Sequence, residues 1–514
     1  MLITSLFVLS GFKSSKTIFK SGSRKLIASL VAGVLVSGCG TMRSYDTEMS
    51  QTITKASNGQ ISAALQQLEG SNTYGGKDLL YYMEKGELQK LGSQFSESRD
   101  AWLLADEKIK IWEEEAKFTP EKLLGNIGSV IINDKVRRYD GQDYEKVMLS
   151  TRLALNHILI GNFDQARTEI KKTHEREAII AELRTREVAQ VEAESEKRQV
   201  KTELNDIRGY PIETLNDPEV ISLKNSYQSA FGHYLAGFVY EALNEPSLAA
   251  PGYRMAIELR PDVIFLQEGL RGLDTRIKKS KRNETDVLFV VETGFIPARS
   301  SVSLPIPARV RGLWIAAPIS FPIIRSDKSI FLPTQLSVNG KNIEIYPVTN
   351  LDAMARRTLK DDMPGIILRG VVRTVAKTAA QMAAANQNQV AGLAVGLLAY
   401  ATESADERGW RSLPAHILIG RSILPAGKHN ISISGPFGVK TENIVVAGTH
   451  TVIPMRLMGE TLYLSQPYVS PQLMEASMEA VQEDPSPLEE ITKSPSKKKP
   501  TKSTLKPVNL GVNQ

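Results

Sequence analysis

The chain has 514 residues, of which 42% are hydrophobic and 23% are charged, the proportions of a globular protein with about two to four domains. Its formal net charge is +6, but residues 1–38 contain five basic residues and no acidic one, which leaves +1 for the rest. The basic balance therefore belongs to the N-terminal segment, and the charge of the remaining chain gives no reason to expect nucleic-acid binding.

An apolar run over Leu26–Val36 follows the basic residues and is too short to span a membrane, but it suits the core of a signal peptide. The pattern Leu35-Val36-Ser37-Gly38-Cys39 resembles a bacterial lipobox, which implies a signal peptide over 1–38 and a lipid on Cys39. Gly40 at the next position implies the outer rather than the inner membrane. Cys39 is the only cysteine, so an intramolecular disulfide is excluded, and an ordinary buried thiol is the alternative to lipidation.

Residues 39–75 are polar and predict a tether with a short helix over Ile61–Leu68. Apolar residues at helical spacing then predict a first helical hairpin from Leu79–Leu91 and Phe95–Trp112. Its expected contact residues are Gly86, Phe95, Ser98, Trp102 and Ala105. A further helix is predicted over 119–135, because Pro120 suits a first helical turn.

A second hairpin is predicted over Lys146–Thr173, with its turn at Gly161-Asn162. Its expected packing residues are Leu153, Ala154, Gly161, Phe163 and Ala166. The second helix is expected to continue over 165–206, which contain neither glycine nor proline and many charged residues. Either one side of this long charged helix packs on the body, or the helix projects as a coiled-coil arm.

The stretch Tyr234–Pro261 predicts a third hairpin, in which Pro261 ends the second helix. Small residues allow two antiparallel helices to approach and tyrosines fill the groove between them: Gly237, Ala249 and Ala256 with Tyr240 and Tyr253. This spacing resembles a tetratricopeptide repeat (TPR) of about 34 residues. Residues 76–277 are therefore expected to form a TPR-like solenoid whose concave face holds a protein partner.

Residues 278–283 are charged and lack apolar side chains, which indicates a linker. Beyond it, apolar residues alternate with a period of two and predict a small β-sandwich over 284–466. The predicted strands are Val287–Val291, Leu313–Ile315, Gln335–Val338, Ile343–Tyr346, His416–Arg421, Asn430–Ser434, Asn443–Ala447 and Thr451–Met455. The expected fold is thus α+β multidomain, an all-α TPR-like solenoid followed by a β-sandwich.

A helical insertion over 351–405 interrupts the strands. Arg369, Arg373 and Lys377 recur every four residues, and we interpret this basic stripe as a solvated face rather than an anion site. Val390–Ala401 is uncharged, with Gly392 and Gly396 spaced for close helix packing. A helix pair buried against the sheet is one interpretation, and insertion into a partner or a membrane surface is the other.

Asp406, Arg408 and Trp410 form a compact group where the insertion rejoins the strands. They predict either a corner that locks helix to strand or a recognition spot, since Trp and Arg are common anchors at interfaces. Residues 467–514 are rich in proline and lysine without periodicity and predict a disordered tail.

No pattern indicates catalysis. The six histidines are scattered, and the sequence contains no HExxH, phosphate-binding loop or GxSxG motif. We therefore expect no enzyme activity, no metal, no cofactor and no nucleic-acid partner.

The lipobox, DLLYYMEKGELQ, YDGQDYEKVMLS, the third hairpin and ADERGWRSLPAHI together resemble an uncharacterised family of proteobacterial TPR-containing lipoproteins over residues 39–465. The resemblance implies a lipid-anchored protein at the periplasmic face of the outer membrane of a Gram-negative bacterium, and it brings no known activity. The expected function is that of a protein–protein interaction adaptor for envelope proteins. The alternatives are an activator of a peptidoglycan synthase and, with the least support, an envelope hydrolase.

Overall fold

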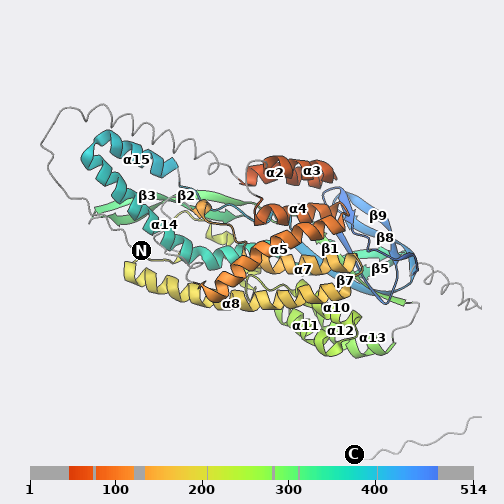
Figure 1. Ribbon diagram of the computed structural model, residues 1–514. Helices are drawn as coiled ribbons and strands as arrows, with labels where there is room; N and C mark the ends of the chain where they lie inside the picture. Colours follow the sequence, from red (N-terminus) through yellow and green to blue (C-terminus); the bar gives the residue numbers. More distant parts are fainter. Residues whose placement is uncertain are drawn as a thin grey trace, which may run out of the picture.

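The computed structural model describes residues 45–72, 77–120, 134–204, 207–279, 284–310, 313–401 and 403–472 (Figure 1). Several predicted features lie outside the described residues: the signal peptide, Cys39, most of the helix over 119–135 and the tail from residue 473 onward. Helices and sheets occur together, so the protein has a mixed α+β structure.

Consecutive helices of the first half pair into hairpins. They are α2 (Tyr45–Ser57) with α3 (Ile61–Ser71), α4 (Leu79–Leu91) with α5 (Phe95–Phe118), α7 (Asp143–Leu159) with α8 (Phe163–Arg198), and α10 (Ala230–Ala242) with α11 (Pro246–Leu259). Shorter helices connect or follow them: η2 (Asp134–Val136), η4 (Ile212–Thr214), α9 (Pro218–Ile221), α12 (Ile264–Arg271) and α13 (Leu273–Lys279). Neighbouring hairpins touch through α3 and α4, α5 and α7, and α8 and α10, so they stack in chain order (Figure 1).

Small residues bring the two helices of a hairpin together, as the sequence predicted. A Cβ atom on Gly86 would lie 2.3 Å from Nε1 of Trp102, and one on Gly237 would lie 2.8 Å from the Tyr253 ring. Any side chain at either glycine would therefore push the hairpin apart. In the turn between α10 and α11, Asn244 adopts φ +59°, a left-handed conformation that asparagine tolerates better than most residues.

The described part of the polar segment that we expected to be a tether forms α2 and α3. These helices bury a narrow stripe of small and medium-sized side chains against α4: Met49, Ala56, Ile61, Ala64 and Leu68. On α4 they cover Leu88 and Leu91. The predominantly polar composition conceals this stripe, because three or four apolar residues per two turns are enough to seat a surface helix.

The second half of the chain is mainly strand. The strands are β1 (Glu284–Thr293), β2 (Arg299–Val310), β3 (Leu313–Ile324), β4 (Gln335–Val338), β5 (Lys341–Glu344), β6 (Tyr346–Asn350), β7 (His416–Pro425), β8 (Gly427–Gly435), β9 (Gly438–Val446), β10 (His450–Met458) and β11 (Thr461–Leu464). A five-stranded sheet has the order β11–β10–β1–β7–β6, with β1 parallel to β10 and antiparallel to β7. A four-stranded antiparallel sheet has the order β5–β4–β8–β9, and β2 and β3 form a two-stranded ribbon.

Each predicted strand lies within or overlaps an observed one, whereas β2 and β11 had no predicted counterpart. Pro305 and Pro307 interrupt the pattern in β2, which forms only the two-stranded ribbon with β3. A turn at Asn339-Gly340 joins β4 to β5, and both residues have positive φ, +49° and +80°.

β1 is buried on both faces, which shows how the layers are arranged. Val287, Phe289 and Val291 face the four-stranded sheet, and together with residues of β4, β8 and β9 they form one apolar core. Leu288 and Val290, which alternate with them, belong to the core shared with the helices. The structure therefore has three layers, helices on the five-stranded sheet and that sheet on the four-stranded one.

The expected division into a solenoid and a separate β-domain differs from this arrangement. A sandwich of two sheets is present, but helices cover the second face of its larger sheet, so both halves share one apolar core. In the predicted linker, Lys278 and Lys279 belong to α13, and residues 280–283 lie outside the described residues. Charge and lack of apolar residues here mark the exposed end of a helix as well as they would mark a linker.

The insertion forms two helices, α14 (Leu351–Gln387) and α15 (Gln389–Ala401), which contact one another. α14 is buried along its first two thirds, where it packs on α7, α8, α9 and the β2–β3 ribbon. α8 ends at Arg198, earlier than the predicted residue 206, and Gln199 adopts φ +54° there. The buried residues of α8 lie between Ala166 and Ile180, and the helix contacts α7, α10 and α14.

Candidate functional site

The first helix of three hairpins faces the five-stranded sheet instead of solvent. α4, α7 and α10 are almost entirely buried, and α7 and α10 contact β10 and β6 respectively. In a stack of helical repeats these helices would line the concave face that we expected to hold a partner. The chain's own sheet covers that face, so the expectation is wrong for this surface.

Charged side chains join the helices to the sheet at this interface. We call them the inner charge cluster: Glu87 and Lys90 of α4, Arg152 of α7, Glu292 of β1 and Arg456 of β10. Each is at most 2% exposed. Lys90 Nζ lies 3.2 Å from Glu292 Oε2, and Arg456 Nη1 lies 3.0 Å from Glu87 Oε1. Arg152 contacts both carboxylates, so the cluster connects α4, α7, β1 and β10.

Electrostatics keep the Glu292 carboxyl ionised despite its burial. Burial alone would raise the pKa of Glu292, but Arg152, Lys90 and Arg456 outweigh it and lower that pKa to about 2. Burial lowers the pKa of Lys90, an effect that the neighbouring carboxylates oppose. Separating the sheet from the helices would leave these charges unpaired in a low-dielectric interior, so the cluster holds the inner face closed.

A second charged group lies at the other end of the same interface. Glu241 of α10, Asp286 of β1 and His450 of β10 place a nitrogen and carboxylate oxygens within 4.8 Å of one another, close enough to surround a metal ion. Arg421 Nη2 already lies 3.0 Å from Glu241 and 2.7 Å from Asp286, and Arg276 Nε lies 2.6 Å from Glu241. Guanidinium groups thus satisfy both carboxylates, and the group joins helix to sheet.

The predicted basic stripe is not a solvated face. Arg373 is 2% exposed, and it pairs with Glu403 at 2.9 Å and Asp134 at 3.2 Å. Lys377 pairs with Glu403 at 2.7 Å. Arg369 differs, because its buried Nε has no hydrogen-bond partner and lies 3.8 Å from Asp134. Spacing along one helix could not reveal that carboxylates distant in sequence return to this stripe.

Trp410 lies at the corner where the helical insertion rejoins the strands, and it is buried there. Its side chain is fully buried, and its ring lies edge-on to that of Trp102, with centroids 6.3 Å apart. Glu145 accepts a hydrogen bond from the Trp410 backbone N–H at 2.7 Å, and Glu84 accepts one from Ser412 N–H at 3.0 Å. These contacts hold the segment that leaves α15 against α4 and α7. Asp406 and Arg408 pair with one another at 2.8 Å beside this corner.

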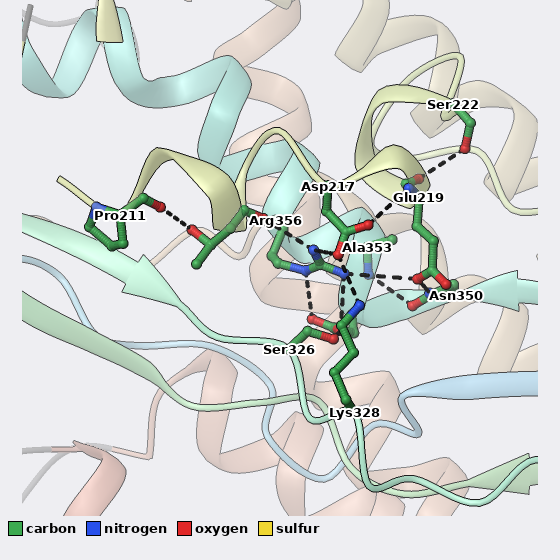
Figure 2. Close-up of polar contacts among 11 residues, drawn as sticks. Pro211, Asp217, Glu219, Ser222, Ser326, Lys328, Asn350, Ala353 and Arg356 are labelled. Carbon is green, nitrogen blue, oxygen red and sulfur yellow. Dashed lines mark hydrogen bonds and ion pairs between the residues drawn. The ribbon is translucent and has the colours of Figure 1, made fainter. Parts of the chain in front are cut away.

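A buried arginine network holds α9 and α14 together (Figure 2). Arg356 of α14 lies 3.0 Å from Asp352 and 2.9 Å from Asp217, and it donates a hydrogen bond to the Thr214 carbonyl oxygen at 3.1 Å. Figure 2 shows Lys328 reaching the same Asp217 carboxylate from the segment after β3. Asp352 and Arg356 have the i,i+4 spacing of a pair on one helix. No sequence motif predicted the rest of the network, because Asp217 and Lys328 come from other elements.

A cavity of about 570 Å³ lies beside this network. Its wall includes Glu219 and Asn350, which Figure 2 shows in contact, and mainly apolar side chains from the end of α11, from β6 and from α14. Pro261, the predicted end of the third hairpin, also lines it. The wall has neither a converging set of catalytic groups nor an unpaired buried charge among its described residues.

The residues predicted to pack the repeats fall into three groups by their exposure. Most are buried: Gly237, Tyr240, Ala249, Tyr253, Ala256, Leu153, Ala154 and Ala166. Phe163 is half-buried, whereas Gly161 and Pro261 are exposed in the turns that end helices. These residues build the helical layer and form no ligand site.

α15 carries the largest exposed apolar side chains of the insertion. Val390, Leu393, Leu397 and Tyr400 are between 62% and 72% exposed, and they follow one another along one stripe of the helix. We call this stripe the α15 apolar face. A separate stripe holds α15 on α14, since a Cβ atom on Gly392 would lie 2.4 Å from that of Ala385. Figure 1 shows α15 at the end of the molecule opposite β8 and β9.

The sequence around the α15 apolar face contains no charge. Residues 378–401 include neither an acidic nor a basic side chain. Within the described ranges, none of the helices is long and apolar enough to cross a bilayer.

Comparisons with known proteins give little similarity. No protein-family model matches this chain, and no curated protein matches it. A solved structure described as a tetratricopeptide repeat protein from Parabacteroides merdae is similar at 13% sequence identity, over 45% of this chain and 98% of that chain, with a TM-score of 0.13. A likeness of this size carries no argument about function.

Proposed function

We propose that this chain is a non-enzymatic lipoprotein, attached through a lipid on Cys39 to the periplasmic face of the outer membrane, that acts as an adaptor for another envelope protein. We further propose that the partner docks on the α15 apolar face. The exposure of Val390, Leu393, Leu397 and Tyr400 on one stripe carries this proposal. Contiguous apolar surface on a folded protein marks an interaction site more often than scattered apolar residues do.

The inner face of the helical hairpins is the less suitable docking surface. The five-stranded sheet and the inner charge cluster occupy it, with Glu87, Lys90, Arg152, Glu292 and Arg456 at most 2% exposed. A partner would have to displace the sheet and leave several buried charges unpaired. The α15 apolar face needs no such rearrangement.

The composition of residues 378–401, which include α15, favours a protein partner over a lipid surface. Helices that lie on membranes carry lysine and arginine on their polar face, where they meet anionic headgroups. Residues 378–401 contain no basic residue, and the polar side chains around the turn between α14 and α15 are Asn386, Gln387, Asn388 and Gln389. An uncharged helix with an apolar stripe suits an apolar groove of another protein.

Site-specific photo-crosslinking in cells tests the proposal. A photoreactive amino acid at Leu393 should form an adduct with one protein, whereas the same probe at Ile111 of α5, an equally apolar and 51% exposed position, should not. Adducts with lipid alone, or the same protein adducts from both positions, would contradict the docking surface. Recovery of a peptidoglycan synthase in the adduct would favour the alternative function, an activator of that enzyme.

A further inference from the structure

β9 forms an open edge of the four-stranded sheet. It has nine residues, whereas the other edge strands of the two larger sheets are shorter: β5 has four, β6 has five and β11 has four. Folded proteins ordinarily keep an edge strand short or covered, because its unpaired backbone groups can bind another chain. Figure 1 shows β9 at the end of the molecule opposite α15, away from the α15 apolar face.

The backbone of β9 points outward at every second residue, and Gln466 shows which ones. The amide oxygen of Gln466 accepts a hydrogen bond from Val445 N–H at 3.2 Å, and its amide nitrogen donates one to the Val445 carbonyl oxygen at 2.9 Å. In an antiparallel sheet the N–H and C=O of one residue face the same neighbour, and alternate residues face the same way. Val439, Thr441 and Asn443 therefore direct both groups away from β8.

These outward groups are free to pair. Val439, Thr441 and Asn443 are exposed, and among the described residues their outward N–H and C=O groups have no hydrogen-bond partner. Gln466 satisfies this edge only at Val445. A second strand can therefore extend the sheet beside residues 439–443 without displacing any part of the chain that the structure describes.

The charges of β9 are arranged symmetrically about Thr441. Lys440 precedes it and Glu442 follows it, and neither forms an ion pair among the described residues. A lysine on an edge strand ordinarily discourages pairing. In a two-fold antiparallel pairing centred on Thr441, however, Lys440 of each copy lies opposite Glu442 of the other. The edge is thus complementary in charge to itself.

We infer that β9 pairs with β9 of a second copy of this chain in this register. Thr441 then exchanges both of its outward hydrogen bonds with Thr441 of the second copy, and Val439 exchanges its own with Asn443. Every outward N–H and C=O group of these three residues obtains a partner. Lys440 and Glu442 take the closer, non-hydrogen-bonded positions, where opposite charges directly across two strands stabilise the pair.

The same geometry limits the extent of the contact. Val439 is 65% exposed in the single chain and becomes partly covered. Gln466 occupies the outward groups of Val445 in each copy, so pairing stops beyond Asn443. The two four-stranded sheets join through a short stretch, and the dimer forms reversibly.

Sedimentation velocity on the purified full-length chain, over a series of concentrations, tests the inference. The parent should show a reversible equilibrium between monomer and dimer. Lys440→Glu places two pairs of like charges in the contact and should weaken dimerisation about tenfold, and Glu442→Lys should do the same. The control Lys341→Glu makes the same change of charge on β5, at the opposite edge of the same sheet, and should dimerise like the parent.

A parent that stays monomeric at every concentration would overturn the inference. Dimerisation of parent-like strength in Lys440→Glu and Glu442→Lys would also overturn it, because the copies would then associate through another surface.

A mixture of the two variants separates pairing from misfolding. The Lys440→Glu chain carries only acidic side chains at positions 440 and 442, and the Glu442→Lys chain carries only basic ones. A mixed dimer therefore has two pairs of opposite charge and should form about tenfold more tightly than either variant dimerises alone. The double variant Lys440→Glu/Glu442→Lys should regain the parent affinity. Absence of association in the mixture, with both variants folded by circular dichroism, would refute the pairing.

Discussion

At the residue scale, the strongest constraints are charges that lie far apart in the sequence and meet in the interior. Lys90 and Glu292 are separated by 202 residues, yet both are buried and in contact. Neither residue has a sequence feature that distinguishes it from the many surface lysines and glutamates of the chain. Sequence patterns record local periodicity, so they could not predict such a pair.

Glu292→Ala should strongly destabilise the protein. It leaves Lys90, Arg152 and Arg456 with one carboxylate, and breaking a buried ion pair from one side costs about 3–5 kcal/mol. The matched variant Glu258→Ala breaks an exposed pair with Lys224 and should change the free energy of unfolding by less than about 1 kcal/mol. Urea unfolding of both variants measures the difference, and equal effects would show that the cluster does not hold the layers together.

The same carboxylate predicts an acid transition. The pKa of Glu292 is about 2 in the folded chain and 4.5 ordinarily. Because the folded-state pKa is lowered, its ion pairs contribute fully above about pH 4.5, and the contribution is lost as pH falls towards 2. The free energy of unfolding should therefore fall more steeply in this range for the parent than for Glu292→Gln. If the free energy of unfolding depended on pH in the same way in both proteins, the acid transition could not be assigned to Glu292.

Cys39 carries the proposed anchor. Under the proposed lipidation, Cys39→Ser should leave an unprocessed precursor and stop fatty-acid labelling, because Cys39 is the only cysteine of the sequence and its thiol is the group that a lipid thioether requires. Metabolic labelling and gel mobility measure the two effects. Labelling that persisted in the variant would remove the lipid anchor from the proposed function.

At the element scale, the sequence predicted hairpins and strands well and their environments poorly. A glycine on one helix that packs against an aromatic residue on the next, as Gly86 packs against Trp102, is a local sequence signature. This signature identified the helices that pair. The same reasoning assigned Arg373 to a solvated face, whereas Glu403 and Asp134 bury it. The sequence favours either a helix pair buried against the sheet or insertion of α15 into a partner or a membrane surface. The structure shows close packing of α15 on α14 together with an exposed apolar stripe.

Gly392→Val should release α15 without unfolding the body. Its side chain would enter the space of Ala385, because even a Cβ atom would lie 2.4 Å from that residue. Amide exchange over 389–401 should accelerate, while the midpoint of thermal unfolding stays near that of the parent. Leu393→Val, on the exposed stripe, is the control and should change neither quantity. Unaltered exchange in Gly392→Val would mean that close packing does not position α15.

At the scale of the whole molecule, the expected separate domains are replaced by three layers with shared cores. β1 explains the difference, since Leu288 faces the helices while Phe289 faces the second sheet. A strand pattern can show that both faces are apolar, but it cannot show that a helical layer covers one of them. The consequence for function is that the hairpins present their outer helices, and the insertion presents α15, to the surroundings.

Hydrogen–deuterium exchange of the full-length chain, purified and in isolated outer membranes, tests this account most directly. It predicts slower exchange over 389–401 in membranes, where the partner is present, and equal protection of 79–91 and 143–159 in both preparations. New protection confined to 79–91 and 143–159 on partner binding, with 389–401 unchanged, would contradict it. That result would mean that the partner enters the inner face of the hairpins and that the sheet moves aside.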